Sequence, residues 1–409
     1  MLELRDLSNS FLSNCSIHSS RVTAAKKRIL GNTNTLNHVN EKTHGKQCPS
    51  PLFSIVNSNY QYIGEDSELC KDCFRSQLKG CETFYENIMG QDLSLQSILD
   101  VLPKMPSKRN IRWLTMQSTE RVVCKYLGYR NQRKHLHHAT VQKLRDELLH
   151  SRGPNAWQYC PIDDIESFLL QLKTYLNLKL ETLWLYALTN IDLLLKPLLY
   201  DLNFPVPRTW HICGFTLIED NAGQSLHYLY GENFFQKLEI AKQLLEACLQ
   251  FSNGFSNYRL YITDLTADNI VYDVAKSKLY LIDLDTIFIV DSSKAEYYNS
   301  VHRYEYEICE GCFSYQPLDI CNYNISDVNI FLACQFLTED LYQRKTGGFL
   351  YPIPQSIQER YPNLQKLLNH CVQCTHSNCH NRFDSAKNTI NLIKEILLSH
   401  DIHLYKQIV

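Results

Sequence analysis

Residues 261–291 read YITDLTADNIVYDVAKSKLYLIDLDTIFIVD, and this stretch decides the fold. Its apolar, strand-like runs carry carboxylates at Asp264, Asp268, Asp283 and Asp285. We expect some of these side chains to be partly buried, and a buried carboxylate without a partner is costly. Either the carboxylates are solvated at turns, or a cation binds beside them.

The composition is that of an ordinary globular protein. The chain has 409 residues, is 44% hydrophobic and 21% charged, and has a formal net charge of −2. A charge so close to neutral argues against a nucleic-acid partner. The most apolar run, 183–200, is interrupted by Asp192 and Lys196, so no transmembrane segment is expected. No signal peptide is visible at the N-terminus, which lacks the basic-then-apolar pattern.

Strands are expected at both ends of a helical region. Residues 111–129 have the composition of two strands joined by a polar turn, and residues 204–230 that of strands with a turn around Asn221–Gly223. Apolar spacing predicts helices over 136–150 and 163–190. On the second helix the predicted inward face is Ile165, Phe168, Leu169 and Leu172.

The rest of the chain is predicted to be mostly helical. An amphipathic helix is expected over 233–250, and helices dominate again after residue 326. The inward residues of the first of these helices are predicted to be Phe234, Leu238, Ala241, Leu245 and Cys248. Strands first, then helices with a β hairpin between them, indicate the α+β class.

Sixteen cysteines, including the C-x-x-C pairs Cys70/Cys73, Cys309/Cys312 and Cys371/Cys374, permit two interpretations. In an oxidising compartment they would form disulfides, whereas in the cytosol such pairs favour metal or redox chemistry. A zinc site is one hypothesis for the second case. Its four ligands would be Cys371, Cys374, Cys379 and His380.

The opening stretch has the spacing of a phosphoryl-transfer site. Asp264 is followed five residues later by Asn269, and a hairpin then leads to Asp283. Because a hairpin returns the chain to its starting end, Asp283 is expected to face Asn269. Asp264 would accept the proton of a substrate hydroxyl. Asn269 and Asp283 would offer hard oxygen ligands to Mg²⁺ or Mn²⁺ on the phosphates of a nucleotide.

A cation for those phosphates is expected upstream on a strand. Lys125, in RVVCKYLG, follows small and apolar residues as in the V-A-I-K motif. Such a lysine needs a helix glutamate to hold it. We prefer Glu181 over Glu147, because the chain after Glu181 leads into the strand-like segment 207–219. Near the C-terminus, Arg382 in NRFDSAKNTI is predicted to form a structural ion pair.

Taken in order, these motifs resemble a known family, the divergent protein kinases of the secretory pathway of the deleted-in-autism type. The resemblance covers about residues 66–400. It rests on stretches that read CKDCF, VVCKYLG, LETLWLYAL, HICG, LEIAKQLLEACLQFSNGF, LYITDLTADNIVYD, LYLIDLDTIFIVD, DVNIFLACQFL, GGFLYPIP and RFDSAKNTI.

The resemblance implies an α+β, protein-kinase-like two-lobe fold with a small β-rich N-lobe, a helical C-lobe and a cysteine-containing N-terminal extension. The implied organisation is a poorly ordered segment (1–65), the extension (66–107), an N-lobe with a helical insertion (108–222) and a C-lobe (223–409).

The family also implies a function, an active-site set and a compartment. The chain would use ATP with Mg²⁺ or Mn²⁺ to phosphorylate a secretory or extracellular protein, in the Golgi lumen or outside the cell. The active-site set would be Lys125, Glu181, Asp264, Asn269 and Asp283. Most cysteines would form disulfides, which disfavours the zinc hypothesis.

An alternative is a weakly active or inactive pseudokinase that serves as a secreted ligand or scaffold, acting on a receptor. No G-x-G-x-x-G motif precedes Lys125, Ile262–Thr263 replace the usual His-Arg, and Leu284–Asp285 replace Phe-Gly. These departures favour the alternative, and they make regulation through a phosphorylated activation loop improbable.

Overall fold

The computed structural model describes residues 110–115, 121–127, 139–150, 157–213, 215–306, 311–314, 316–344, 346–373 and 381–408. The predicted N-terminal segment, the predicted extension and the Cys70/Cys73 pair lie outside these residues. The chain forms two compact units. Of the described residues, the first unit contains 110–115, 124–127, 211–213 and 215–217, and the second contains the others. The predicted lobe boundaries stay predictions.

The strands predicted over 111–129 and 204–230 are present, and four of them belong to one sheet. Its four strands have the order β1-β2-β5-β4. They are β1 (Asn110–Thr115), β2 (Arg121–Tyr126), β4 (Thr209–Cys213) and β5 (Thr216–Asp220). Within the first unit, the backbone N–H of Leu127 donates to the carbonyl of Phe215 at 2.9 Å, which extends the pairing of β2 with β5.

The turn predicted around Asn221–Gly223 is also present, between β5 and β6 (Gln224–Ser225). Gly223 has a φ of +100°, and a Cβ at this position would lie 2.1 Å from the carbonyl oxygen of Tyr272. Only glycine fits, because both the backbone angle and the close neighbouring strand exclude a side chain.

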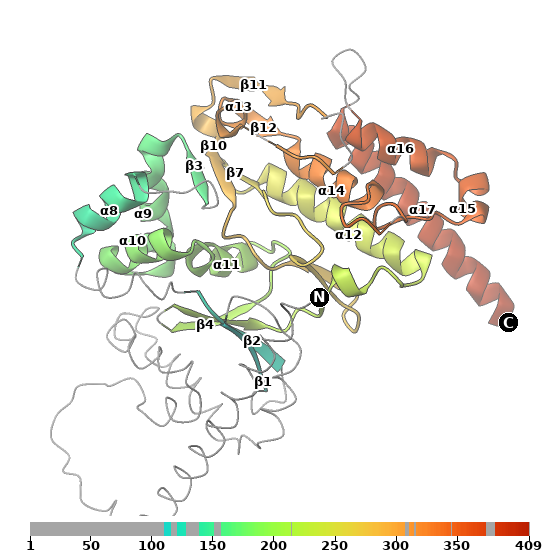
Figure 1. The fold of residues 1–409 in the computed structure, drawn as a ribbon, viewed down its shortest axis with the longest axis horizontal. Helices are drawn as coiled ribbons and strands as arrows, with labels where there is room; N and C mark the ends of the chain where they lie inside the picture. Colours follow the sequence, from blue (N-terminus) through green and yellow to red (C-terminus); the bar gives the residue numbers. More distant parts are fainter. Residues whose placement is uncertain are drawn as a thin grey trace, which may run out of the picture. The chain divides into compact units, whose positions relative to one another are not determined.

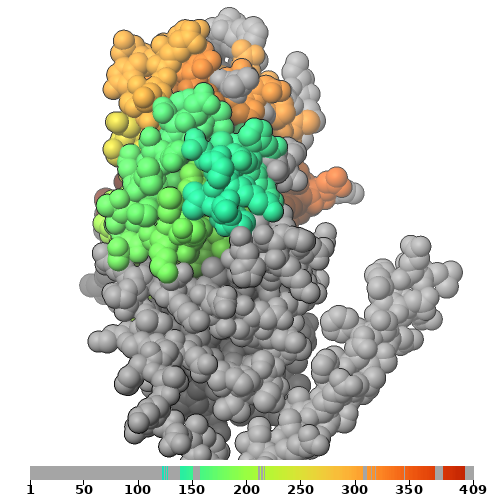
Figure 2. All heavy atoms as spheres, turned by 90° about the vertical axis from the view of Figure 1, so that its left-hand side faces the viewer, coloured from blue at the N-terminus to red at the C-terminus, as the bar shows by residue number. Residues whose placement is uncertain are grey.

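The described residues between β2 and β4 contain four α-helices. They are α8 (Val141–His150), α9 (Ile165–Leu176), α10 (Leu180–Thr189) and α11 (Asp192–Asp201). Figure 1 shows them as a green group, and Figure 2 shows that side chains of this part of the chain form one continuous face of the surface. The predicted inward face of α9 is confirmed, because Ile165, Phe168, Leu169 and Leu172 are all buried.

The single helix predicted over 163–190 is wrong, because the structure has two helices there. Asn177, with φ 52° and ψ 47°, adopts the left-handed conformation that ends α9, and α10 begins at Leu180. Asparagine tolerates this conformation better than most residues, so it can close a helix where the apolar spacing continues.

Short sheets connect the helices of the second unit. Strand β10 (Phe288–Asp291) pairs parallel with β3 (Gln158–Cys160) and antiparallel with β7 (Tyr258–Tyr261). The remaining strands are β8 (Ile270–Asp273) and β9 (Lys278–Leu281), which join β6, and the parallel pair β11 (Tyr297–His302) and β12 (Tyr323–Ser326). Short helical turns are η2 (Ile162–Asp164), η3 (Leu226–Tyr228), η4 (Ser292–Lys294), α13 (Pro317–Cys321) and α15 (Gln355–Arg360).

Four helices in the C-terminal part of the second unit pack against one another. They are α12 (Phe234–Asn253), α14 (Val328–Thr338), α16 (Asn363–Val372) and α17 (Arg382–Ile408). Helix α12 packs against α14 and α17, and α16 packs against both of those (Figure 1). Helix α14 is buried from Val328 to Leu337, as expected of a helix that is apolar on all sides. The mixture of helices and small sheets confirms the α+β class.

The inward face predicted for α12 is confirmed except at its first residue. Leu238, Ala241, Leu245 and Cys248 are buried, whereas Phe234 is half-buried. Phe234 opens the helix directly after Asn233, whose side-chain oxygen accepts a hydrogen bond from the N–H of Gln236 at 2.9 Å. This N-terminal cap marks the edge of the core.

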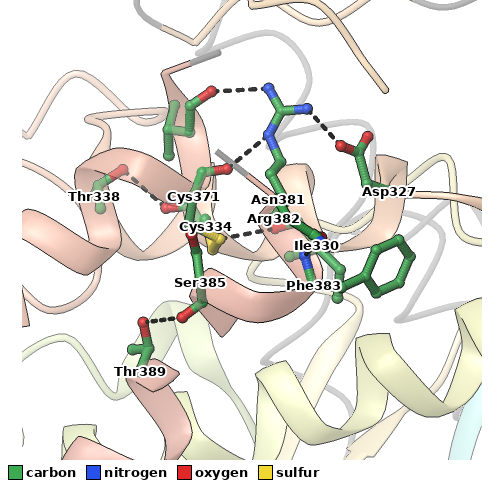
Figure 3. The surroundings of a disulfide bond; sticks show 11 residues. Asp327, Ile330, Cys334, Thr338, Cys371, Asn381, Arg382, Phe383, Ser385 and Thr389 are labelled. Atoms are coloured by element: carbon green, nitrogen blue, oxygen red, sulfur yellow. Dashed lines mark hydrogen bonds and ion pairs between the residues drawn. A yellow bond between two sulfur atoms is a disulfide. The ribbon is translucent and has the colours of Figure 1, made fainter. Parts of the chain in front are cut away.

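Two disulfides in which both cysteines are described connect elements of the second unit. Cys160 of β3 is bonded to Cys321 of α13, and Cys334 of α14 is bonded to Cys371 of α16 (Figure 3). Cys371 is therefore not available as a thiolate, which is a correction to the four-ligand zinc hypothesis for 371–380. Cys374, Cys379 and His380 lie outside the described residues.

The described part of the chain contains no helix that is both long and apolar enough to span a membrane.

Candidate functional site

The loop between β7 and β8 brings two predicted site residues together. The side-chain amide of Asn269 donates to the Asp264 carboxylate at 2.8 Å and to the Asp264 backbone carbonyl at 3.0 Å. Asp264 is exposed and Asn269 is half-buried. Because both bonds use the amide nitrogen of Asn269, its amide oxygen is the atom that can coordinate a cation.

The β8–β9 hairpin returns the chain to this loop, as predicted. Ile270 pairs with Leu281, and the N–H of Ile282 donates to the carbonyl of Asn269 at 3.0 Å. Asp283 therefore follows a residue that is bonded directly to Asn269. The predicted return of the chain is confirmed for the backbone, whereas the binding of a metal by Asn269 and Asp283 stays a prediction.

A buried asparagine on α14 holds the start of the loop. Asn329 accepts a hydrogen bond from the N–H of Ile262 at 2.8 Å and donates to the carbonyl of Leu260 at 2.8 Å. Its amide also donates to the Ser252 hydroxyl of α12 at 3.1 Å. A long-range side chain thus fixes the backbone two residues before Asp264, where Ile262–Thr263 replace the His-Arg expected of ordinary kinases.

Two further bonds hold the loop at later points. The Thr263 hydroxyl donates to the carbonyl of Thr286 at 2.8 Å, which connects the loop to the segment after Asp283. The N–H of Ala267 donates to the Tyr342 hydroxyl at 2.7 Å. The loop is therefore held by hydrogen bonds near both of its ends.

A buried ionic cluster lies beside Asp283. The Lys196 ammonium of α11 lies 2.9 Å from the Glu219 carboxylate of β5 and 3.4 Å from the Asp192 carboxylate. It also donates to the backbone carbonyl of Ile282. Burial alone would lower the pKa of Lys196, but the negative charges of Glu219, Asp192 and Asp283 raise this pKa above its ordinary value. The lysine is therefore a permanent cation.

Asp192 makes a second contact with the same segment. Its carboxylate accepts a hydrogen bond from the N–H of Leu284 at 3.2 Å. The predicted site set omits Asp192, Lys196 and Glu219. One signal in the sequence could have revealed the first two, because they are charges four residues apart inside the apolar run 183–200.

The other two predicted site residues, Lys125 and Glu181, belong to different units. Lys125 is a buried residue of β2, in the first unit. Glu181 is exposed in the first turn of α10, in the second unit, and its competitor Glu147 is half-buried on α8. The ion pair between Lys125 and Glu181 stays a prediction.

Arg382 forms the structural ion pair that its motif predicts. Its guanidinium lies 2.9 Å from the Asp327 carboxylate and donates to the carbonyls of Cys371 at 2.8 Å and Val372 at 3.0 Å (Figure 3). A further bond reaches the carbonyl of Tyr304. Arg382 therefore connects the start of α17 to the end of α16 and to the residue before α14.

Comparison with known proteins agrees with these features. A family model described as the protein-kinase domain of FAM69 matches residues 183–374. The matched range includes Asp264, Asn269, Asp283 and the Lys196 cluster, whereas Lys125, Glu181 and Arg382 lie outside it.

Curated relatives carry the name Divergent protein kinase domain 2A. The Homo sapiens protein is 25% identical over 262 residues, which cover 61% of this chain and 58% of the relative. The Mus musculus protein is 24% identical over 277 residues, covering 65% and 61%, and the Xenopus tropicalis protein is 24% identical over 263 residues, covering 61% and 58%. The chain thus spans about three fifths of the length of these relatives.

Proposed function

Residues 183–374 belong to the divergent protein-kinase-domain family, and on that premise we propose that the chain binds ATP with Mg²⁺ or Mn²⁺ and transfers phosphate to a protein hydroxyl. One observation carries the proposal. Asp264 and Asn269 are hydrogen-bonded on a loop whose backbone is bonded directly to the segment that contains Asp283.

The donor atoms at this place fit a hard divalent cation. Asn269 has its amide nitrogen committed to Asp264, which leaves the amide oxygen for a metal, and Asp283 adds a carboxylate. Amide and carboxylate oxygens are the ligands that Mg²⁺ prefers, usually with water and substrate phosphates. When bound, the metal would neutralise the charge that develops on the phosphates.

In the proposed reaction Asp264 is the general base. Its exposure lets a substrate hydroxyl approach, and the amide of Asn269 orients its carboxylate. A positioned general base contributes roughly 10²–10⁴ in rate. Lys125 is proposed to contact the nucleotide phosphates and Glu181 to orient Lys125.

The acceptor is proposed to be a secretory or extracellular protein, and the compartment to be the Golgi lumen or the extracellular space. The disulfides Cys160–Cys321 and Cys334–Cys371 support an oxidising compartment, because such bonds are rare in the cytosol.

The decisive experiment separates nucleotide binding from phosphate transfer. The chain, purified under oxidising conditions, is titrated with ATP in Mn²⁺, in Mg²⁺ and in EDTA, and thermal unfolding is followed. We expect a metal-dependent rise in the midpoint of unfolding, because a ligand of the folded state stabilises that state. Asp283→Asn and Lys125→Met should abolish the rise, whereas Asp285→Asn serves as the neighbouring control. No rise in either metal would contradict the proposal.

Transfer is then measured with labelled ATP on a panel of secreted proteins. Asp264→Asn should bind ATP as the wild type does and lose most of the transfer. If Asp264→Asn transfers phosphate at the wild-type rate, Asp264 is not the base.

A pseudokinase that acts as a secreted ligand or scaffold is the second candidate. The Lys196 ammonium favours it, since a permanent cation near Asp283 already compensates part of its charge without metal. In that case nucleotide binding, with or without metal, is accompanied by no labelled product. Asp283→Ala would then impair folding or receptor binding.

A further inference from the structure

Two side chains of α11 contact the backbone on either side of Asp283. Lys196 donates to the carbonyl of Ile282, and Asp192 accepts the N–H of Leu284 at 3.2 Å. The two residues are one helical turn apart, so they lie on the same face of the helix. The residue before Asp283 is therefore bonded to an ammonium and the residue after it to a carboxylate, and both groups belong to α11.

Glu219 of β5 connects this pair to a third element. Its carboxylate lies 2.9 Å from the Lys196 ammonium, and the exposed fractions of the side chains are 0% for Lys196 and 2% for both Asp192 and Glu219. Water does not compete for these bonds, so they are stronger than the same bonds at a surface. If residues 282–284 changed conformation, the buried charges and the backbone groups of this segment would lose these partners, which is costly.

We propose that Asp192 and Lys196 form a clamp that holds Asp283 in the position required for a metal-bound nucleotide. The two are positioning residues, and their role rests on the proposed function. The clamp consists of the chain's own side chains on α11, a helix that the predicted site set did not include.

The closure of the clamp is tested first by hydrogen exchange in the absence of nucleotide. Exchange is followed in overlapping peptides that cover residues 280–287. Asp192→Ala removes the acceptor for the Leu284 amide and should speed its exchange, whereas Asp192→Asn keeps an oxygen and should preserve more of the protection. Arg382→Lys, at the other buried ion pair, is the control and should leave these peptides unchanged. Equal exchange in the wild type and Asp192→Ala would overturn the clamp.

The role of the clamp in binding is tested with Lys196→Met and Lys196→Gln. Dissociation constants are measured by calorimetry for ATP with Mn²⁺ and for ATP with EDTA, well below the unfolding temperature of each variant. Lys196→Met should weaken binding in Mn²⁺ by about ten-fold or more, the usual effect of losing a partner that orients a metal ligand. Binding in EDTA should change far less. Lys196→Gln, which can still donate to the Ile282 carbonyl, should recover part of the loss.

The outcomes separate the two proposals. A wild type that binds no nucleotide overturns the proposed function, and with it the role of the clamp. Two results would overturn the clamp alone, provided that the wild type binds nucleotide and Lys196→Met folds. The variant has the wild-type affinity for ATP with Mn²⁺, or it loses the same affinity in Mn²⁺ and in EDTA. If Lys196→Met does not fold, the same titrations on Asp192→Ala and Asp192→Asn decide.

Discussion

Two buried cations of this protein differ in what surrounds them. Arg382 and Lys196 both have an exposed side-chain fraction of 0%, and both are bonded to carboxylates at 2% exposure. Arg382 has one carboxylate, Asp327, and three backbone carbonyls as partners. Lys196 has two carboxylates and one carbonyl, and the charge of a third carboxylate, Asp283, acts on it.

The difference indicates two roles. A guanidinium has five donors in a rigid plane, so one arginine can donate to acceptors on several segments at once, which is a structural role. An ammonium is a compact charge with three donors, and here it lies among acidic side chains. Because a divalent cation and an ammonium both suit an acidic environment, the Lys196 region is the candidate for chemistry and the Arg382 region is the candidate for stability.

Removing the Arg382 guanidinium should have the largest effect on stability. Arg382→Met leaves the buried Asp327 carboxylate without its cation and should lower the free energy of unfolding by about 3–5 kcal/mol. Denaturant unfolding measures this value, and calorimetry at low temperature should give an unchanged affinity for ATP with Mn²⁺. A folded Arg382→Met with weaker metal-dependent binding would remove the distinction between the two cations.

The disulfide next to Arg382 should contribute nearly as much. Cys334 and Cys371 are 37 residues apart in sequence. Without the bond the unfolded chain gains conformational entropy, which should lower the free energy of unfolding by roughly 3–4 kcal/mol. The double variant Cys334→Ala/Cys371→Ala is compared with the wild type by denaturant unfolding. Cys248→Ala, at a buried cysteine without a disulfide, is a control for the loss of a thiol. If both variants lose the same stability, the bond itself adds nothing.

A histidine makes the Arg382 region sensitive to pH. Burial lowers the pKa of His302 below its ordinary value of 6.5, against the opposing charge of Asp327. Because the folded pKa is below the unfolded one, the unfolded state binds more protons in the interval between them. The contribution of neutral His302 to the free energy of unfolding is therefore fully present above about pH 6.5, and it is lost as the pH falls through the folded pKa.

The measurement is the midpoint of thermal unfolding at about pH 7.5 and about pH 5.5, on either side of the ordinary histidine range. His302→Gln should show a smaller loss between these two values than the wild type. An identical loss in both proteins would assign the pH dependence to other groups.

Lys237 is a further buried lysine, and its replacement should have the smallest effect on stability. Lys237 of α12 is buried, its ammonium lies 5.5 Å from the centre of the Phe349 ring, and it has no ion pair among the described residues. Burial lowers its pKa, so folding favours its neutral form and the charged form is destabilising at neutral pH. Lys237→Met should slightly raise the midpoint of unfolding at neutral pH, and the gain should fade as the pH rises toward 10.5, where the wild type also loses its charge. A lower midpoint at neutral pH would show that the contact with Phe349 outweighs the burial.

Much of the fold and part of the candidate site could be predicted because the signals are local. The hairpin that joins Asn269 to the Asp283 segment follows from two short strands and a polar turn. The turn at Gly223 follows from its residue type, and the face of α12 follows from apolar spacing. Arg382 was found because its motif is compact in the sequence.

Sequence reasoning missed one local feature and others that depend on residues far apart in the chain. The break between α9 and α10 depends on one left-handed asparagine within a continuous apolar pattern. The pairing of Cys371 with Cys334 excludes it as a zinc ligand, and spacing alone favoured the nearer cysteines.

The sequence by itself determined which residues could perform chemistry, namely the ordered set of Asp264, Asn269 and Asp283 and the strands that carry them. Only the tertiary structure decided what holds that set. Lys196 is 23 residues from Glu219 and 86 from Ile282 in the chain, and the two bonds form because packing of α11, β5 and the hairpin excludes water from one common point. Neighbouring carboxylates keep this buried lysine charged, and only the folded chain brings those carboxylates to it.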